Sequence, residues 1–97
     1  KKLPHIFGNF QIQNYLELLL LLDDNNIKKS LITKYYFHKN KRWDLFLDNN
    51  ILIKLPNTNI DKAIKNYKSL EKLKKVRSNS IIDLRIENRI VIENDQS

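Results

Sequence analysis

The sequence is poor in the residues that mark many kinds of functional site. Its 97 residues include no cysteine, no methionine, two prolines and a single glycine, Gly8. Without cysteine the chain forms no disulfide framework, no zinc–thiolate site and no thiolate nucleophile. One glycine is too few for the glycine-rich loops that bind phosphate groups. Because the sequence starts at Lys1-Lys2 without methionine, we expect it to be a piece of a longer protein.

Histidine is scarce as well. His5 and His38 are the only two, and they lie in unrelated segments of the sequence. Neither has a second histidine or a carboxylate at ligand spacing, which disfavours a metal site or a catalytic pair. No nucleophile motif is present either. We therefore predict no catalytic residue, no metal ion, no cofactor and no small-molecule substrate, and we expect that the chain is not an enzyme.

Long apolar runs are also missing. The leucine run at residues 18–22 is far shorter than the roughly 20 residues that a membrane span needs. The start of the chain does not resemble a signal peptide, because Lys1-Lys2 is followed by Pro4 and Gly8 rather than by an apolar stretch. The given residues therefore predict no membrane span of their own.

The residues that are present describe one folded domain with a basic surface. Hydrophobic residues make up 41% of the chain and charged residues 30%, which is typical of a globular protein. The net charge is +7, a sign of binding to nucleic acid or to an anionic membrane. The chain is also rich in lysine, asparagine and isoleucine together, as happens when codon usage is skewed toward A and T. The charge is therefore a weak signal.

Hydrophobic periodicity predicts two helices. The first covers residues 11–22, with Asn9 as its N-cap. The second runs over about residues 58–75, where Thr58 and Asp61 form a variant of the capping box. Both helices have an apolar stripe, so we expect both to pack on a sheet.

Three short segments are predicted as strands. They cover residues 31–38, 42–47 and 51–55, and they are rich in β-branched and aromatic residues. The polar turn at residues 48–50 suits a tight hairpin, because asparagine tolerates the left-handed backbone that such turns require. Sequential strands joined by short turns predict an antiparallel meander, in which Trp43 is a core residue.

The last segment alternates with a period of two over residues 82–92. One register holds Ile82, Leu84, Ile86, Asn88, Ile90 and Ile92, and the other register holds Asp83, Arg85, Glu87, Arg89 and Val91. The unbroken phase predicts one long strand, with room for a bulge near Asn88, rather than a hairpin, and charges of both signs are typical of an edge strand. We therefore predict an α+β fold: an antiparallel sheet, made of a three-strand meander plus a long C-terminal edge strand, with two helices packed on it.

Aromatic and basic residues suggest an alternative function. Residues 35–37 are Tyr-Tyr-Phe, with lysines on both sides, and such a set resembles a stacking surface for single-stranded nucleic acid. Adjacent residues of a strand point to opposite faces, so only part of the set can form one surface. A basic nucleic-acid-binding domain is therefore the alternative to a protein-binding module, and we expect no nucleic-acid partner.

Four short motifs follow one another along the chain. They are Leu3-Pro4-x-x-x-Gly8, Lys41-Arg42-Trp43-x-Leu45-x-Leu47-Asp48-Asn49, Leu55-Pro56 followed by the helix with Ala63, and Ile82-Asp83-Leu84-Arg85. In this order they resemble the C-terminal β domain of the FtsQ/DivIB family of bacterial cell-division proteins.

The resemblance implies a place for the chain in a larger protein. It implies a single-pass inner-membrane protein at the division septum, whose POTRA domain and β domain lie in the periplasm. Residues 1–8 would then lead in from the POTRA-like domain, residues 9–94 would form the β domain, and residues 95–97 would be a tail.

The resemblance also implies a partner. In the family the final strand receives the small membrane protein FtsB in complex with FtsL, which recruits and regulates the septal peptidoglycan synthase. The open edge of a strand supports such pairing, because its free N–H and C=O groups accept an extended peptide by β-augmentation. The implied contact residues are Arg85, Ile86, Glu87, Asn88, Arg89, Ile90, Val91, Ile92 and Asn94. We interpret Lys41 and Arg42 first as solvated charges, with a secondary contact to an acidic partner residue as the alternative.

Overall fold

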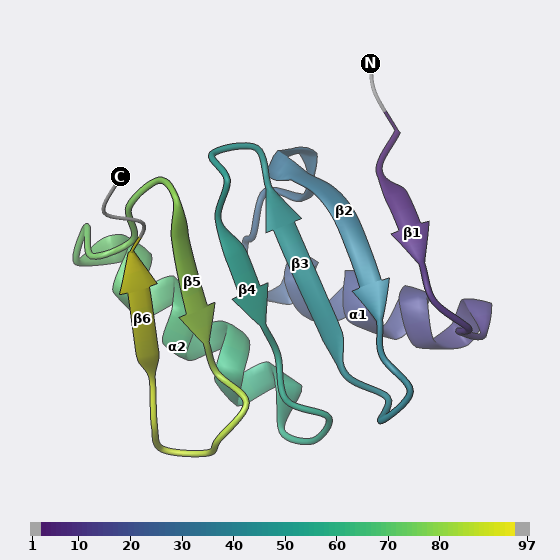
Figure 1. Ribbon diagram of the computed structural model, residues 1–97. Helices are drawn as coiled ribbons and strands as arrows, with labels where there is room; N and C mark the ends of the chain where they lie inside the picture. The colour runs from purple at the N-terminus through teal and green to yellow at the C-terminus, as the bar shows by residue number, and fades with distance from the viewer. Residues whose placement is uncertain (1–2, 95–97) are drawn as a thin grey trace.

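The computed structural model describes residues 3–94, which form a six-stranded sheet and two helices (Figure 1). In chain order the elements are β1 (His5–Phe7), α1 (Ile12–Asp24), the 3₁₀ turn η1 (Lys29–Leu31), β2 (Ile32–Phe37), β3 (Trp43–Leu47), β4 (Leu52–Lys54), α2 (Ile60–Lys72), β5 (Ser80–Asp83) and β6 (Val91–Asn94). The α+β class with two packed helices is confirmed, and so is the meander, formed by β2, β3 and β4.

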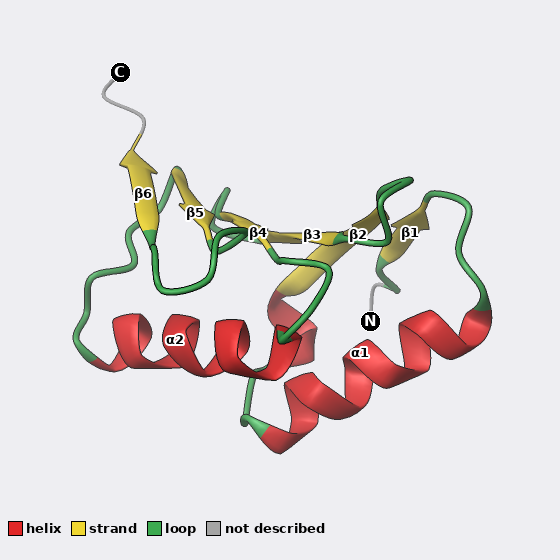
Figure 2. Cartoon of the chain, turned by 90° about the horizontal axis from the view of Figure 1, so that it is seen from below, coloured by secondary structure: helices red, strands yellow, loops and turns green. Residues whose placement is uncertain are grey.

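The strands lie in the sheet in the same order as in the sequence, from β1 at one edge to β6 at the other. The pairs β1–β2 and β4–β5 are parallel, and the other pairs are antiparallel. Each parallel pair is joined by a helix, because parallel neighbours need a long crossover connection. Both crossovers pass on the same side, so α1 and α2 cover one face of the sheet and leave the other face open (Figure 2).

The core lies between the helices and the sheet. Its buried residues are Leu18 and Leu22 of α1, Ala63, Ile64 and Tyr67 of α2, and Ile32, Tyr35, Phe37, Trp43, Leu45, Ile51, Ile53, Leu55, Ile82 and Leu84 of the strands and their ends. Trp43 is only 2% exposed, which confirms its prediction as a core residue. Because side chains alternate along a strand, the strand residues that lie between these core residues point toward the open face.

Gly8 lets the chain turn from β1 into α1. Its φ angle is +104°, and a Cβ atom at this position would lie 2.2 Å from the carbonyl oxygen of Phe37. No side chain fits this close approach of two backbone segments. The glycine of the first sequence motif therefore has a structural role, and the extended segment around it contains β1, a strand that the sequence did not predict as part of the sheet.

The helix caps differ from the prediction. The first helix starts three residues after Asn9, and the N–H of Gln11 donates to Oδ1 of Asn14 at 3.1 Å. The second helix is capped by Asn59, in a left-handed conformation with φ of 54°, and Thr58 lies outside it. Asp61 accepts hydrogen bonds from Asn25 and Lys65 instead of completing a capping box. The carboxylate of Asp61 therefore serves these side-chain contacts and does not cap the helix.

The prediction of one long C-terminal strand is wrong. Residues 80–94 form an antiparallel hairpin in which β5 pairs with β6, and residues 84–90 connect the two strands. Asn88 turns the loop with a left-handed φ of 63°. The N–H of Arg89 donates to the carbonyl oxygen of Ile86 at 3.2 Å. The period-two pattern runs on through a loop, and an asparagine in a left-handed conformation breaks the strand there.

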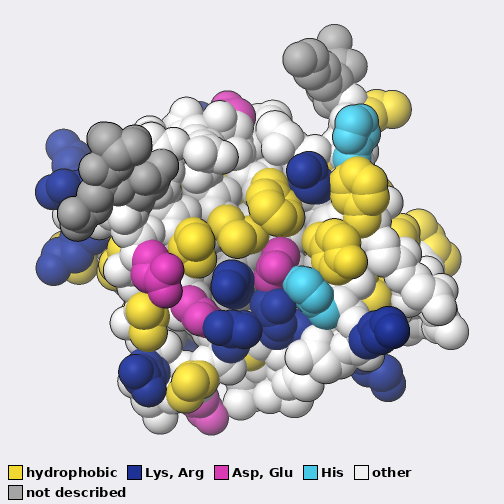
Figure 3. Space-filling model, in the orientation of Figure 1, with side chains coloured by type: hydrophobic (Ala, Val, Ile, Leu, Met, Phe, Trp, Pro, Cys, Tyr) yellow, Lys and Arg dark blue, Asp and Glu magenta, His cyan; other side chains and the backbone are white. Residues whose placement is uncertain are grey.

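The aromatic triplet divides between the two faces, as alternation requires. Tyr35 and Phe37 are buried in the core, and Tyr36 lies on the open face, where its ring stacks on Phe7 with 6.5 Å between ring centroids. Figure 3 shows this face, where charged and apolar side chains are interleaved. Only one residue of the triplet is therefore available to a ligand on the open face.

Candidate partner-binding edge

β6 is an edge strand, and among the strands of residues 3–94 it neighbours only β5 in the sheet (Figure 1). It contains three of the implied contact residues, Val91, Ile92 and Asn94, together with Glu93. The remaining implied contact residues lie in the loop before it, so the structure brings the whole set together at one end of the sheet.

The direction of the β5 backbone follows from one hydrogen bond. The N–H of Leu84 donates to the carbonyl oxygen of Lys54 in the β4 strand at 2.9 Å. Because backbone groups alternate in direction along a strand, the N–H and C=O groups of Ile82 also point toward β4. Those of Ile81 and Asp83 then point toward β6.

The same alternation identifies the free groups of β6. Val91 and Glu93 lie opposite the two β5 residues whose backbone faces β6, so they exchange hydrogen bonds with that strand. Ile92 and Asn94 alternate with them. Their N–H and C=O groups therefore point away from the sheet, where an extended peptide can reach them.

Side chains on the inner side of β6 fix its register. Ile92 lies opposite Ile82 and packs against the core. Oδ1 of Asn94 accepts a hydrogen bond from the hydroxyl of Ser80 at 2.6 Å. Because a slip of one residue would expose Ile92 and break this bond, the outward direction of the Ile92 and Asn94 backbone is a fixed property of the fold.

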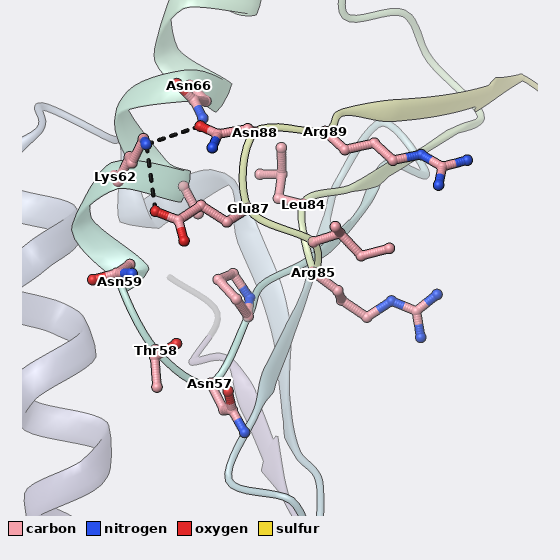
Figure 4. A pocket seen from close by; sticks show the side chains of 13 residues that line it. Asn57, Thr58, Asn59, Lys62, Asn66, Leu84, Arg85, Glu87, Asn88 and Arg89 are labelled. Atoms are coloured by element: carbon pink, nitrogen blue, oxygen red, sulfur yellow. Dashed lines mark hydrogen bonds and ion pairs between the residues drawn. The ribbon is translucent and has the colours of Figure 1, made fainter.

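The loop before β6 is held against α2 (Figure 4). Lys62 donates to Oδ1 of Asn88 at 3.0 Å and lies 3.5 Å from Oε1 of Glu87. A hollow of about 100 Å³ lies between the loop and the start of the helix. Ile86 and Ile90 remain exposed at the two ends of the loop. Ile90 directly precedes β6, and Ile86 lies four residues earlier in the same loop.

Arg85 and Asp83 form an ion pair at the end of β5. Nε and Nη2 of Arg85 donate to the two carboxylate oxygens of Asp83 at 2.9 and 2.7 Å. The backbone N–H of Arg85 also donates to Asp83. These hydrogen bonds lower the pKa of Asp83, while burial opposes the shift in part. The pair holds the start of the loop on the β5 strand.

Arg85→Ala is expected to raise the pKa of Asp83 toward its ordinary value, because the charged donors that favour the carboxylate are lost. A carboxyl group whose pKa is lowered by folding adds stability above its unfolded pKa, and this contribution is lost as the pH falls through the folded pKa. Titration of the side-chain carboxyl carbons by NMR measures the shift. Asp61 serves as the internal control, since its pKa is lowered by Lys65 and Asn25. An unchanged pKa for Asp83 in the variant would contradict the pairing.

Arg42 is buried, and its interpretation as a solvated charge is wrong. The residue is 8% exposed, and Nη1 donates to Oδ1 of Asp44. Oδ2 of the same carboxylate lies 2.8 Å from Nε2 of His38. Sequence reasoning missed this cluster, although Arg42 and Asp44 share one register of the strand predicted at residues 42–47. Lys41 remains exposed, at a turn where its φ angle is 65°.

Arg42 and Arg85 line one hollow at the end of the sheet. The same hollow is lined by Tyr36, His38 and Pro56. The structure therefore brings Arg42, from the basic motif, close to the first residue of the predicted partner-binding set. Lys41 lines a different hollow, between α1 and the sheet.

Two further features follow from the described residues. Neither helix within residues 3–94 combines the length and the apolar character that crossing a bilayer requires. Over the same part of the chain, His, Asp and Glu side chains form no group of three or more that could hold a metal ion.

Comparison with known proteins identifies relatives of the chain. Residues 1–85 match the family described as cell division protein FtsQ/DivIB, C-terminal. The chain is 40% identical over 55 residues to the cell division protein FtsQ of Rhizobium radiobacter, which covers 55% of the chain and 26% of that protein. It is also 40% identical over 55 residues to the cell division protein FtsQ of Agrobacterium fabrum, where it covers 17% of the relative. The chain thus spans a small part of these relatives, and the family match ends before β6.

Proposed function

Because the chain belongs to the FtsQ/DivIB family of cell-division proteins, we propose that it is a non-enzymatic binding module of the division apparatus. Its role is to present the outer edge of β6 to an extended segment of another protein. The observation that carries this proposal is the outward direction of the Ile92 and Asn94 backbone at the edge of the sheet.

Backbone pairing at this edge supplies a modest affinity. Ile92 and Asn94 each offer one N–H and one C=O group, and each hydrogen bond contributes about 0.5–1.5 kcal/mol net. Ordering an extended peptide opposes this gain. Apolar contacts with the exposed Ile86 and Ile90 are therefore needed for a stable and specific complex.

The proposed partner is an FtsB-type protein in complex with an FtsL-type protein. Its extended segment would add a seventh strand beyond β6, and its side chains would contact the loop. The contact set is Arg85, Ile86, Glu87, Asn88, Arg89, Ile90, Val91, Ile92 and Asn94. We place a secondary contact at Lys41 and Arg42, supported for Arg42 by the hollow that it shares with Arg85. The septal peptidoglycan synthase would be reached through this partner.

The proposed setting is the periplasmic side of the inner membrane at the division septum. There the chain would be the β domain of a membrane-anchored parent protein, with residues 1–8 leading in from a POTRA-like domain. The proposed tail at residues 95–97 lies outside the described residues. The family of the relatives, all named for cell division, supports this setting.

Isothermal titration calorimetry tests the proposal. The titrant is the periplasmic segment of the FtsB-type protein from the same organism, and we expect a complex of one segment per chain. A single-stranded oligonucleotide serves as the comparison, because binding that weakens steeply with added salt would instead favour the nucleic-acid alternative. No heat of binding with the protein segment would contradict the proposed function.

A further inference from the structure

An apolar stripe runs along the outer face of α1. Ile12, Leu16 and Leu20 are 66%, 50% and 63% exposed, and they follow one another at intervals of four residues. Residues four apart lie above one another on a helix, so the three side chains form one continuous ridge. Leu18 and Leu22 already face the core from the other side of the helix. At least half of each of these three side chains is therefore left uncovered by this domain.

The charged residues of α1 are all acidic, whereas the net charge of the whole chain is positive. The helix contains Glu17, Asp23 and Asp24 and no lysine or arginine, whereas the whole chain has a net charge of +7. Asp23 and Asp24 lie in the last turn, where the helix dipole disfavours negative charge. Asp23 is offset by Lys29, whose Nζ lies 2.9 Å from its Oδ1.

Oε1 of Glu17 accepts a hydrogen bond from Nε2 of Gln13 at 3.1 Å, but two carboxylates of the helix stay without a cation to pair with in residues 3–94. None of the ion pairs formed within residues 3–94 involves Glu17 or Asp24. On a helix these two residues lie next to the Leu20 side of the apolar ridge, because seven residues make about two turns. The ridge is thus flanked by negative charge on its solvent side.

We propose that the outer face of α1 binds an amphipathic helix of another protein, whose apolar stripe is flanked by lysine or arginine. Leucine-sized side chains of the partner would pack between Ile12, Leu16 and Leu20, as ridges pack into grooves in helix pairs. Its basic side chains would pair with Glu17 and Asp24 and would offset the dipole at the helix end.

Other occupants fit this face less well. A second copy packed through the same face would bring two acidic helices together, in two chains that each carry +7. An anionic bilayer would repel the carboxylates next to the ridge. An amphipathic helix with basic flanks can pack its apolar stripe on the ridge and pair its cations with the two carboxylates.

This surface is separate from the edge of β6. The α1 helix crosses beneath the half of the sheet that contains β1 and β2, and β6 lies at the opposite edge (Figures 1 and 2). The two surfaces can therefore be occupied at the same time, and the proposal for α1 stands without the proposal for β6.

Two synthetic peptides test the proposal against the whole ¹⁵N-labelled chain. Both are helical and have the same leucine stripe, which is flanked by lysine in one and by glutamate in the other. We expect the leucine–lysine peptide to shift the amide signals of Ile12, Leu16 and Leu20, and the leucine–glutamate peptide to leave them unchanged. In the double variant Glu17→Lys, Asp24→Lys we expect the affinity to fall about tenfold or more.

The control variant carries the same charge change elsewhere. Asp48→Lys combined with Glu71→Lys replaces two exposed acids outside α1, and its affinity should match that of the unchanged chain. Fluorescence of the buried Trp43 verifies that each variant is folded. The proposal is overturned if the signals of α1 do not move, if both peptides bind equally, or if both double variants lose affinity alike. Sedimentation that shows dimers dependent on Leu16 would also overturn it, because the face would then belong to a second copy.

Discussion

Asp44→Ala is expected to lower the free energy of unfolding by about 3–5 kcal/mol, the range seen when one partner of a buried ion pair is removed. Asp44 is buried on β3, where its carboxylate pairs with Arg42 and with His38. Without it, the guanidinium of Arg42 stays buried and loses the charge that compensates it. The carbonyl oxygen of Leu55, 3.4 Å from Nη1, is a weak substitute. Urea denaturation followed by the fluorescence of Trp43 measures the loss.

Asp83→Ala is the matched control for this prediction. Lys54 lies between Asp44 and Asp83 in the cross-strand register, so both acids belong to one row of the sheet and both pair with an arginine. Arg85, the partner of Asp83, is exposed, and exposed ion pairs contribute about 0–1 kcal/mol. Equal losses of stability in the two variants would show that burial of Arg42 is not the source of the effect.

Ile92→Pro is expected to weaken binding of the FtsB-type segment at least about tenfold. Proline removes one outward N–H donor, and its ring occupies the space through which the added strand must approach. The pairing of β6 with β5 is kept, because the hydrogen bonds to β5 come from Val91 and Glu93. Proline with its nitrogen facing solvent is tolerated in edge strands, so we expect the domain to remain folded. Calorimetry with the same segment gives the affinity.

Ile92→Ala separates the backbone from the side chain. Alanine also removes the contact of Ile92 with the core, but it keeps the N–H group. We expect its affinity to stay within about threefold of that of the unchanged chain, since both outward backbone groups of residue 92 are kept. If alanine and proline weaken binding equally, the side chain of Ile92 and not its backbone carries the interaction.

Much of the fold could be predicted from periodicity. Leu18, Leu22, Ile64 and Tyr67 have helical spacing and indeed face the core. The meander was predictable because alternating strands are separated by short polar turns. The β1 strand was not predictable, because a strand of three residues is too short to show a period-two alternation. Its place in the sheet depends on a parallel pair with β2, which no local pattern specifies.

The C-terminal hairpin shows where alternation misleads. Ile86 and Ile90 continue the phase of Ile82, yet they lie in a loop, because Asn88 adopts a left-handed conformation. The pattern correctly predicted an edge, but placed it too early in the chain. Ile90 precedes the strand, so a proline there would not test pairing. Which amides face outward follows only from the register against β5, and that register is a tertiary property.

Arg42 shows a second limit of the sequence. Its register predicts the face of the sheet on which it lies, but not its exposure. Burial depends on Asp44 two residues later, on His38 across the turn and on the carbonyl group of Leu55. These contacts form only when the chain folds, so the sequence around Arg42 and the neighbouring exposed lysine does not indicate that Arg42 is buried.

Amide hydrogen exchange of β6 tests the central claim most directly. The chain is followed by NMR in deuterated buffer, with and without a saturating amount of the FtsB-type segment. We predict that the segment slows exchange of the Ile92 and Asn94 amides, while those of Val91 and Glu93, already bonded to β5, change little. Binding that leaves the Ile92 and Asn94 amides exchanging as fast as in the free chain would contradict strand addition at this edge.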